Sequence, residues 1–136
     1  MTQIYIQTEP IPKARARTCI RQGRVMSYTP KSTSDAESEI RKQVEQLGEF
    51  FNKEVALNVK LTFYIAKPPS APKKRKHPIT RPDLDNYVKL VLDACNKYLW
   101  ADDSQICHLV ARKVYDVKPG ILITVEPAVD IEKALG

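Results

Sequence analysis

The sequence predicts an α+β fold in a single domain, residues 1–136, with one mixed or antiparallel sheet and two helices packed on one of its faces. Four separate segments alternate apolar and polar residues as strands do, and two others repeat apolar residues at helical steps of three and four. The chain has no internal repeat or linker, and 136 residues suffice for one core but not for two.

The first third of the chain holds a strand and a basic arm. Residues 3–8 alternate and predict the first strand. Residues 11–31 follow as the arm, which is expected to form a short hairpin through residues 21–24, with Val25 and Tyr28 as its apolar anchors.

A helix and the clearest strand come next. The helix is expected to be capped at Ser34 or Asp35 and to stop at Gly48 or to extend as far as Lys53. Its apolar stripe consists of Ile40, Val44 and Leu47. Residues 56–66 then alternate cleanly, which predicts a half-buried strand.

The remaining elements surround a second helix. Residues 67–82 contain five prolines among basic residues, so we expect an exposed loop. After the second helix, residues 106–117 and 121–125 are expected to pair as two strands around residues 118–120. Residues 128–136 are expected to form a tail or a short helix.

Four carboxylates lie at the two ends of the second predicted helix, which begins at about residue 84. They are Asp83 and Asp85 at its start, and Asp102 and Asp103 in the turn that follows it. Together they could hold Mg²⁺, a hard cation that takes oxygen ligands and keeps several waters. Such a site would serve phosphodiester hydrolysis, with Lys89 adding positive charge beside the phosphate.

By spacing alone, a purely structural explanation is at least as good. Asp83 occupies an N-cap position, and Asp85 precedes Lys89 by four residues, as in an ordinary helix ion pair. The Asp102–Ser104 turn is likewise typical of local side-chain to backbone bonding. The residues by themselves leave both interpretations open.

The charge distribution favours a polyanionic partner. The net charge is +6, and two segments carry more than all of it: residues 1–31 contribute +5 and residues 67–82 contribute +6. Two basic segments around a carboxylate cluster favour binding to a nucleic-acid backbone. They argue against a metal-dependent phosphotransferase acting on a small nucleotide, which would not need two such segments.

Cysteine usage and hydropathy indicate a cytoplasmic protein without a membrane partner. The three cysteines are odd in number and have no C-x-x-C spacing, which suits a reducing compartment, and Cys95 falls on the apolar helix face as a core residue. No signal peptide is recognisable, and no apolar stretch approaches the roughly 20 residues of a membrane span.

One stretch resembles a known family. This stretch contains Asp83-Leu84-Asp85-Asn86, Lys89, Asp93, Trp100 and Asp102-Asp103-Ser104-Gln105. It resembles the signature of the RusA family of crossover junction endodeoxyribonucleases, the Holliday junction resolvases. A second block, similar to the opening segment of many members, comprises Pro10-Ile11-Pro12-Lys13, Arg15, Arg17 and Tyr28-Thr29-Pro30. This chain departs from the family pattern in one place, a long basic insertion before Arg81 that shorter members of the family lack. The insertion affects the details of DNA contact and not the chemistry.

The resemblance implies roles for the site residues. Asp83, Asp85 and Asp103 would be catalytic carboxylates that bind Mg²⁺, with Asp102 as the alternative third ligand, and Lys89 would be the active-site lysine. The resemblance also implies a RusA-like, homodimeric α+β protein that makes paired cuts in a four-way DNA junction during recombination and repair.

The DNA contacts and the dimer complete the hypothesis. The residues expected to contact DNA are Lys13, Arg15, Arg17, Lys73, Lys74, Arg75, Lys76 and Arg81. The residues offered for a dimer interface are Ile4, Ile6, Phe50 and Phe51. The competing hypothesis from another class is a non-catalytic basic DNA-binding protein, in which the aspartates only cap and pair.

Overall fold

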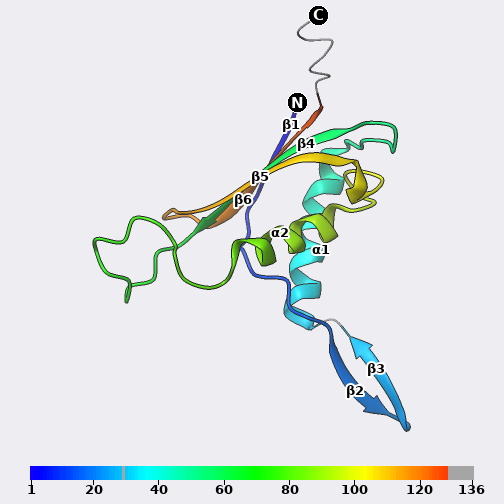
Figure 1. The fold of residues 1–136 in the computed structure, drawn as a ribbon, viewed down its shortest axis with the longest axis horizontal. Coiled ribbons are helices and arrows are strands. Elements are labelled where there is room, and N and C mark those ends of the chain that lie inside the picture. The colour runs from blue at the N-terminus through cyan, green and yellow to red at the C-terminus, as the bar shows by residue number, and fades with distance from the viewer. Residues whose placement is uncertain (29, 129–136) are drawn as a thin grey trace, which may run out of the picture.

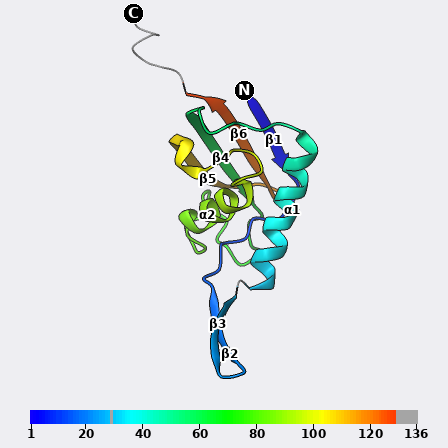
Figure 2. The same ribbon diagram turned by 90° about the vertical axis from the view of Figure 1, so that its right-hand side faces the viewer.

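The fold is built on a four-stranded sheet with both helices on the same face (Figures 1 and 2). The computed structural model describes residues 1–28 and 30–128. The sheet strands are β1 (Thr2–Ile6), β4 (Leu57–Ile65), β5 (Ile106–Tyr115) and β6 (Gly120–Pro127), in the order β1-β6-β4-β5, and the helices are α1 (Lys31–Leu47) and α2 (Leu84–Cys95). The predicted α+β class, with two helices on one face, is confirmed.

The sheet is mixed because β4 lies in its centre. β4 pairs antiparallel with β6 and parallel with β5, while β1 pairs antiparallel with β6. The prediction that β5 and β6 pair with each other is therefore wrong. Nearness in sequence favours a hairpin, but β4 buries Leu57, Val59, Leu61 and Phe63 completely and takes the central position between them.

In the described part of the chain, the buried apolar residues form one hydrophobic core between the sheet and the helices. α1 contributes Ile40 and Val44, and α2 contributes Leu90 and Val91, all essentially inaccessible to solvent. Cys95 is also fully buried, and this burial raises the pKa of its thiol to about 12. Cys95 is thus a core residue, as predicted.

The helix limits differ modestly from prediction. α1 begins at Lys31, before the expected cap at Ser34 or Asp35, because the amide of Ser34 already donates to the carbonyl of Pro30. It ends at Leu47 and does not extend to Lys53, since Gly48 adopts a left-handed φ of 74° that closes the helix.

The predicted hairpin is present, but its anchors are not buried. It consists of β2 (Arg17–Arg21) and β3 (Arg24–Tyr28), joined by Gln22 and Gly23 with φ of 52° and 73°, as a two-residue primed turn requires. Figure 1 shows this ribbon projecting away from the sheet and helices. Val25 and Tyr28 are exposed, so the expectation that they anchor the hairpin in the core is wrong.

Three further expectations concern the surface and the end of the chain. Ile6 is fully buried in the core, so it is unavailable for the dimer interface, whereas Phe50 is 55% exposed.

No helix in the described part of the chain is long and apolar enough to cross a bilayer. The predicted tail or helix lies almost wholly outside the described residues.

Candidate active site

The two aspartates at the start of α2 lie in one pocket with basic residues. Asp83 occupies the N-cap position, and Asp85 lies in the first helical turn. The pocket has a volume of about 470 Å³ and is lined by Lys13, Ala14, Arg15, Ala16, Asp83, Asp85, Asn86, Lys89 and Asp93. The structure thus brings together three of the four predicted catalytic side chains: Asp83, Asp85 and Lys89.

Neither aspartate has the structural role that spacing allowed. The side chain of Asp83 makes no capping hydrogen bond. Among the ion pairs of the described residues there is none between Asp85 and Lys89. Both carboxylates and the lysine are exposed in the pocket, so their charged groups are available to a ligand.

A lysine on β5 holds the segment that enters α2. Nζ of Lys113 donates to the carbonyl oxygens of Thr80 and Pro82, each at 2.9 Å. These two bonds fix the backbone immediately before Asp83 and thereby orient the start of the helix. Sequence reasoning missed Lys113, because nothing local to residue 113 indicates that this strand faces the loop.

The N-terminal arm forms the opposite wall of the pocket. The amide of Lys13 donates to the carbonyl of Asn86 at 2.9 Å, and the amide of Ala14 donates to Oγ1 of Thr33 at 3.2 Å. The arm is therefore tied to α2 and to α1 at successive residues. This places Arg15, which is exposed, at the pocket edge.

Lys13 is neutralised by the protein. Its ammonium pairs with Glu37, and its Nζ lies 3.2 Å from Oδ2 of Asp93. Burial disfavours the charged ammonium, but the bonds to Glu37 and Asp93 outweigh that effect and raise the pKa of Lys13. Because Glu37 lies on α1 and Asp93 on α2, Lys13 links the arm to both helices through these ion pairs.

Asp93 is a pocket residue that the site prediction did not include. It follows Lys89 by four residues and Asp85 by eight, which places the three side chains on one helical face. This spacing was sufficient to identify Asp93. Its carboxylate connects the pocket to the next acidic group, Asp103, because the charge of Asp93 acts on that carboxyl.

Asp103 lies outside the pocket lining but is firmly oriented. It begins the short 3₁₀ helix η1 (Asp103–Gln105), and its Oδ1 accepts a hydrogen bond of 2.6 Å from Nε1 of Trp100, which is fully buried. Burial raises the pKa of Asp103, the Trp100 bond opposes this, and the nearby charges of Asp93 and Asp102 raise it further.

Asp102 has a local structural role. Its Oδ2 accepts from the amide of Ser104 at 3.1 Å, and its own amide donates to Oε1 of Gln105 at 2.8 Å. The bonds from Ser104 lower the pKa of Asp102, and Lys97 lies 3.5 Å away as an ion-pair partner. The turn chemistry expected for this segment is therefore carried by Asp102, whereas the half-buried carboxylate of Asp103 accepts from Trp100 and is influenced by the charge of Asp93.

The donor set fits a hard divalent cation, although it is open. Within residues 1–28 and 30–128, no group of three or more His, Cys, Asp or Glu side chains is close enough to form a metal cage. Mg²⁺ is commonly held by only one or two carboxylates, with waters and substrate phosphates completing the shell. Asp83 and Asp85 supply such a pair of carboxylates.

The basic loop, residues 67–82, leads into Asp83 at the start of α2 and is held by hydrogen bonds within itself. Nζ of Lys67 donates to the carbonyls of Lys73 and Arg75, at 3.3 and 2.7 Å. Five of its basic side chains are exposed, namely Lys67, Lys73, Lys74, Lys76 and Arg81, whereas Arg75 is half-buried. Figure 1 shows the loop and the β2–β3 ribbon projecting from different sides of the start of α2.

Exposed carboxylates beside a lysine can bind a divalent cation and a phosphate, and two basic segments in the same chain suit a polyanion. A family model described as Endodeoxyribonuclease RusA matches residues 7–126. The chain belongs to the RusA endodeoxyribonuclease family, as its motifs indicated.

Two relatives match over most of their length. The chain is 34% identical over 107 residues to the "Crossover junction endodeoxyribonuclease rusA" of Lactococcus phage r1t, an alignment that covers 76% of this chain and 79% of the phage protein. It is 33% identical over 132 residues to the "Uncharacterized protein YqaN" of Bacillus subtilis (strain 168), which covers 86% of this chain and 89% of that protein.

Proposed function

We propose that residues 1–136 form a single magnesium-dependent endonuclease domain that cuts four-way DNA junctions in two strands, during recombination and repair. The observation that carries the proposal is the pair Asp83 and Asp85, which share a pocket with Lys89 while neither carboxylate caps or pairs. Membership of the RusA family supports nuclease chemistry, and the phage relative's name supports a crossover junction as substrate.

Each side chain has a distinct part in this mechanism. Asp83 and Asp85 would hold Mg²⁺, which when bound supplies an activated water and offsets charge on the leaving oxygen. Lys89, on the same pocket wall, attracts the phosphate and stabilises the negative charge that develops in the transition state. Asp103, oriented by Trp100, is the proposed third acidic group, whereas Asp102 is engaged in its turn.

The rival hypothesis of a non-catalytic DNA-binding protein has less support. It requires that the aspartates serve as a cap and as a helix ion pair, and Asp83 and Asp85 do neither. A purely binding protein would also gain nothing from exposed carboxylates that repel phosphate.

The direct test is cleavage of a synthetic four-way junction by the purified protein. The junction and a linear duplex of the same sequence are each incubated with magnesium and with a chelator. We expect symmetric cuts in the junction with magnesium, little cutting of the duplex, and no cutting with the chelator. Tight junction binding without cleavage in any divalent metal would favour the non-catalytic hypothesis instead.

A first prediction concerns the exposed lysines of the basic loop. Changing Lys73, Lys74 and Lys76 together to Gln should weaken binding to every DNA shape. Each phosphate contact made by a lysine releases condensed counterions and so favours binding, and the variant loses this release. The slope of log affinity against log salt should become shallower by about 2 to 3. Fluorescence anisotropy at several salt concentrations measures both quantities.

The matched control for the loop removes three exposed lysines elsewhere. Lys42, Lys53 and Lys118 are exposed and lie outside the loop and the pocket. Their joint change to Gln alters net charge equally, so it should change the salt slope much less. Equal slopes in the two triple variants would mean that the loop makes no phosphate contacts.

A second prediction is that the protein is a homodimer. Two strands of a junction must be cut at symmetry-related places, and one chain offers a single pocket of this kind in its described part, so an isologous pair is the simplest assembly. Light scattering at micromolar concentration without DNA should give about twice the chain mass of 15.5 kDa. A monomer that makes paired cuts without dimerising on the junction would exclude this assembly.

A further inference from the structure

The β2–β3 ribbon is not packed on the body of the protein. Every residue of β3 is exposed, and in β2 only Cys19 is half-buried. Figures 1 and 2 both show the ribbon extending beyond the start of α1, away from the sheet. An isolated two-stranded hairpin is only marginally stable in water. Because the ribbon is not packed on the core, a binding partner outside the described chain would explain why it is kept.

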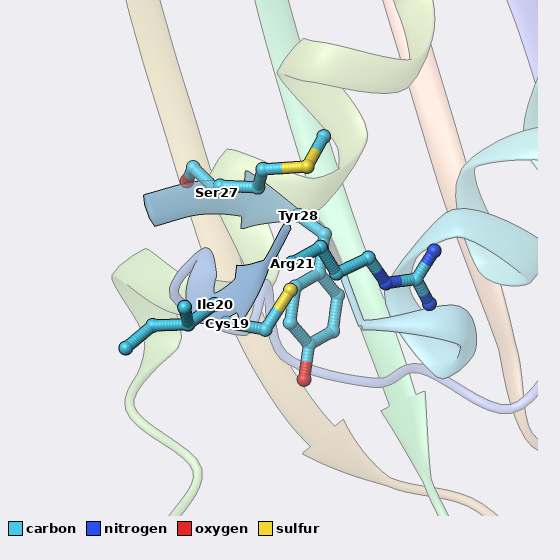
Figure 3. A pocket seen from close by; sticks show the side chains of 6 residues that line it. Cys19, Ile20, Arg21, Ser27 and Tyr28 are labelled. Atoms are coloured by element: carbon cyan, nitrogen blue, oxygen red, sulfur yellow. The ribbon is translucent and has the colours of Figure 1, made fainter. Parts of the chain in front are cut away.

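The register divides the ribbon into two chemically different faces. Residues directly opposite each other share a face, and successive residues alternate between faces. What we call the arginine face therefore comprises Arg17, Cys19, Arg21, Arg24, Met26 and Tyr28, and the uncharged face comprises Thr18, Ile20, Val25 and Ser27. Figure 3 shows Arg21 and Tyr28 projecting to one side of the ribbon and Ile20 to the other.

The arginine face carries unbalanced positive charge. Arg21 and Arg24 are direct cross-strand partners, and like charges in such pairs are destabilising. No ion pair of the described residues involves Arg17, Arg21 or Arg24. The chain has no acidic residue from position 10 to position 34 that could offset them.

The ribbon is continuous with the pocket. Residues 13–16 line the pocket, and β2 begins at the next residue, Arg17. Arg15 and Arg17 thus extend the positive charge from the edge of the pocket onto the ribbon. A polyanion that lies along the arginine face would lead directly to Asp83 and Asp85.

We propose that the arginine face of the β2–β3 ribbon binds a duplex DNA arm and guides it into the pocket. A two-stranded ribbon fits the major groove, and arginine side chains bind phosphates and base edges. Met26 and Tyr28, which are 50% and 47% exposed, add apolar surface against the sugars. This inference rests on the proposed function, because it supplies that site with its DNA.

A second copy of the chain is a less suitable occupant of this face. Two arginine faces would repel each other, and the unbalanced arginines need an acidic partner. DNA supplies regularly spaced negative charge along the whole face. The ribbon therefore determines affinity and arm placement, and it takes no part in the chemical step.

The test variant is Arg21→Gln with Arg24→Gln, which also removes the like-charge pair and so leaves folding at least as favourable. We expect junction and duplex binding, measured in a chelator, to weaken about 10-fold or more, and the salt slope to fall by about 2. Single-turnover cutting at saturating protein should stay within about twofold of wild type. The control variant is Ile20→Thr with Val25→Thr, on the uncharged face. It should leave the affinity, the salt slope and the cutting rate unchanged.

The outcomes separate this inference from the proposed function. Unchanged affinity and salt slope in a variant that still cuts would overturn the ribbon's role and leave the nuclease intact. Weakened binding in a protein whose wild-type form cuts nothing would support the ribbon and reject the proposed chemistry. A lower solution mass in the arginine variant would overturn the inference by showing that the face joins two copies of the chain.

Discussion

Asp83→Asn and Asp85→Asn, made separately, should each reduce junction cutting by at least about 1000-fold in magnesium, a loss of roughly 4 kcal/mol in transition-state stabilisation. Asn keeps the size of the side chain but removes its charge and one oxygen ligand. Junction binding should stay equal or become slightly tighter, because a negative charge near the phosphates is lost. Stability should change little, since neither carboxylate caps α2 or forms an ion pair.

Single-turnover cutting, binding without magnesium and thermal unfolding together test this expectation. Asp35→Asn is the matched control, because Asp35 is an exposed aspartate on α1 that does not line the pocket. It should leave all three measurements near wild type. Parallel losses of cutting, binding and thermal stability in the Asp83 or Asp85 variants would instead assign these residues to folding, as the capping interpretation requires.

The parts of the fold that depend on neighbouring residues were predictable from sequence. The 21–24 turn, the stop at Gly48 and the alternating strand β4 all follow from local patterns, and all are present. The pairing of β5 was not predictable in this way. Which strand lies between β5 and β6 is decided by packing across the whole sheet, and β4 takes that place although it precedes both by more than 40 residues.

The same distinction applies to the site. Asp83, Asp85 and Lys89 were predicted as site residues because their motif resembles the RusA signature, and they lie within two turns of one helix. Asp93 was accessible by the same helical periodicity. The contacts that position these residues could not be predicted from local patterns. Lys113 bonds to Pro82, 31 residues earlier, and Lys13 bonds to Glu37, 24 residues later. Local sequence patterns contain no record of such contacts, which arise only when the sheet and helices assemble.

Asp103 offers a sharp test because its structural and proposed catalytic roles can be separated. Its carboxylate is partly buried near Asp93 and Asp102, and burial is the main reason that its pKa is raised. The ionised form is therefore less favourable in the folded state than in the unfolded chain. Stability linked to this group is highest when it is protonated and falls as pH rises from the unfolded pKa of about 3.9 through the higher folded value.

Asp103→Asn and Asp103→Ala should both reduce cutting about 100-fold or more, yet they should change stability in opposite directions. Asn removes the unfavourable charge and retains an oxygen that can accept from Nε1 of Trp100, so the melting temperature at pH 7 should rise by roughly 1–3 °C. Ala leaves the donor of the buried Trp100 without this acceptor, at a cost of about 1–3 kcal/mol, and the melting temperature should fall by several degrees.

Thermal unfolding of the metal-free protein between about pH 3 and pH 7 distinguishes the two effects. The gain from Asn should shrink as the pH falls below about 4, where Asp103 is protonated in both states, while the loss from Ala should persist because it comes from the indole bond. Wild-type cutting by the Asn variant would remove Asp103 from the mechanism and leave Asp83 and Asp85 as the acidic pair. Equal destabilisation by Asn and Ala would show that Trp100 requires a charged acceptor, and that Asp103 contributes to stability as an anion.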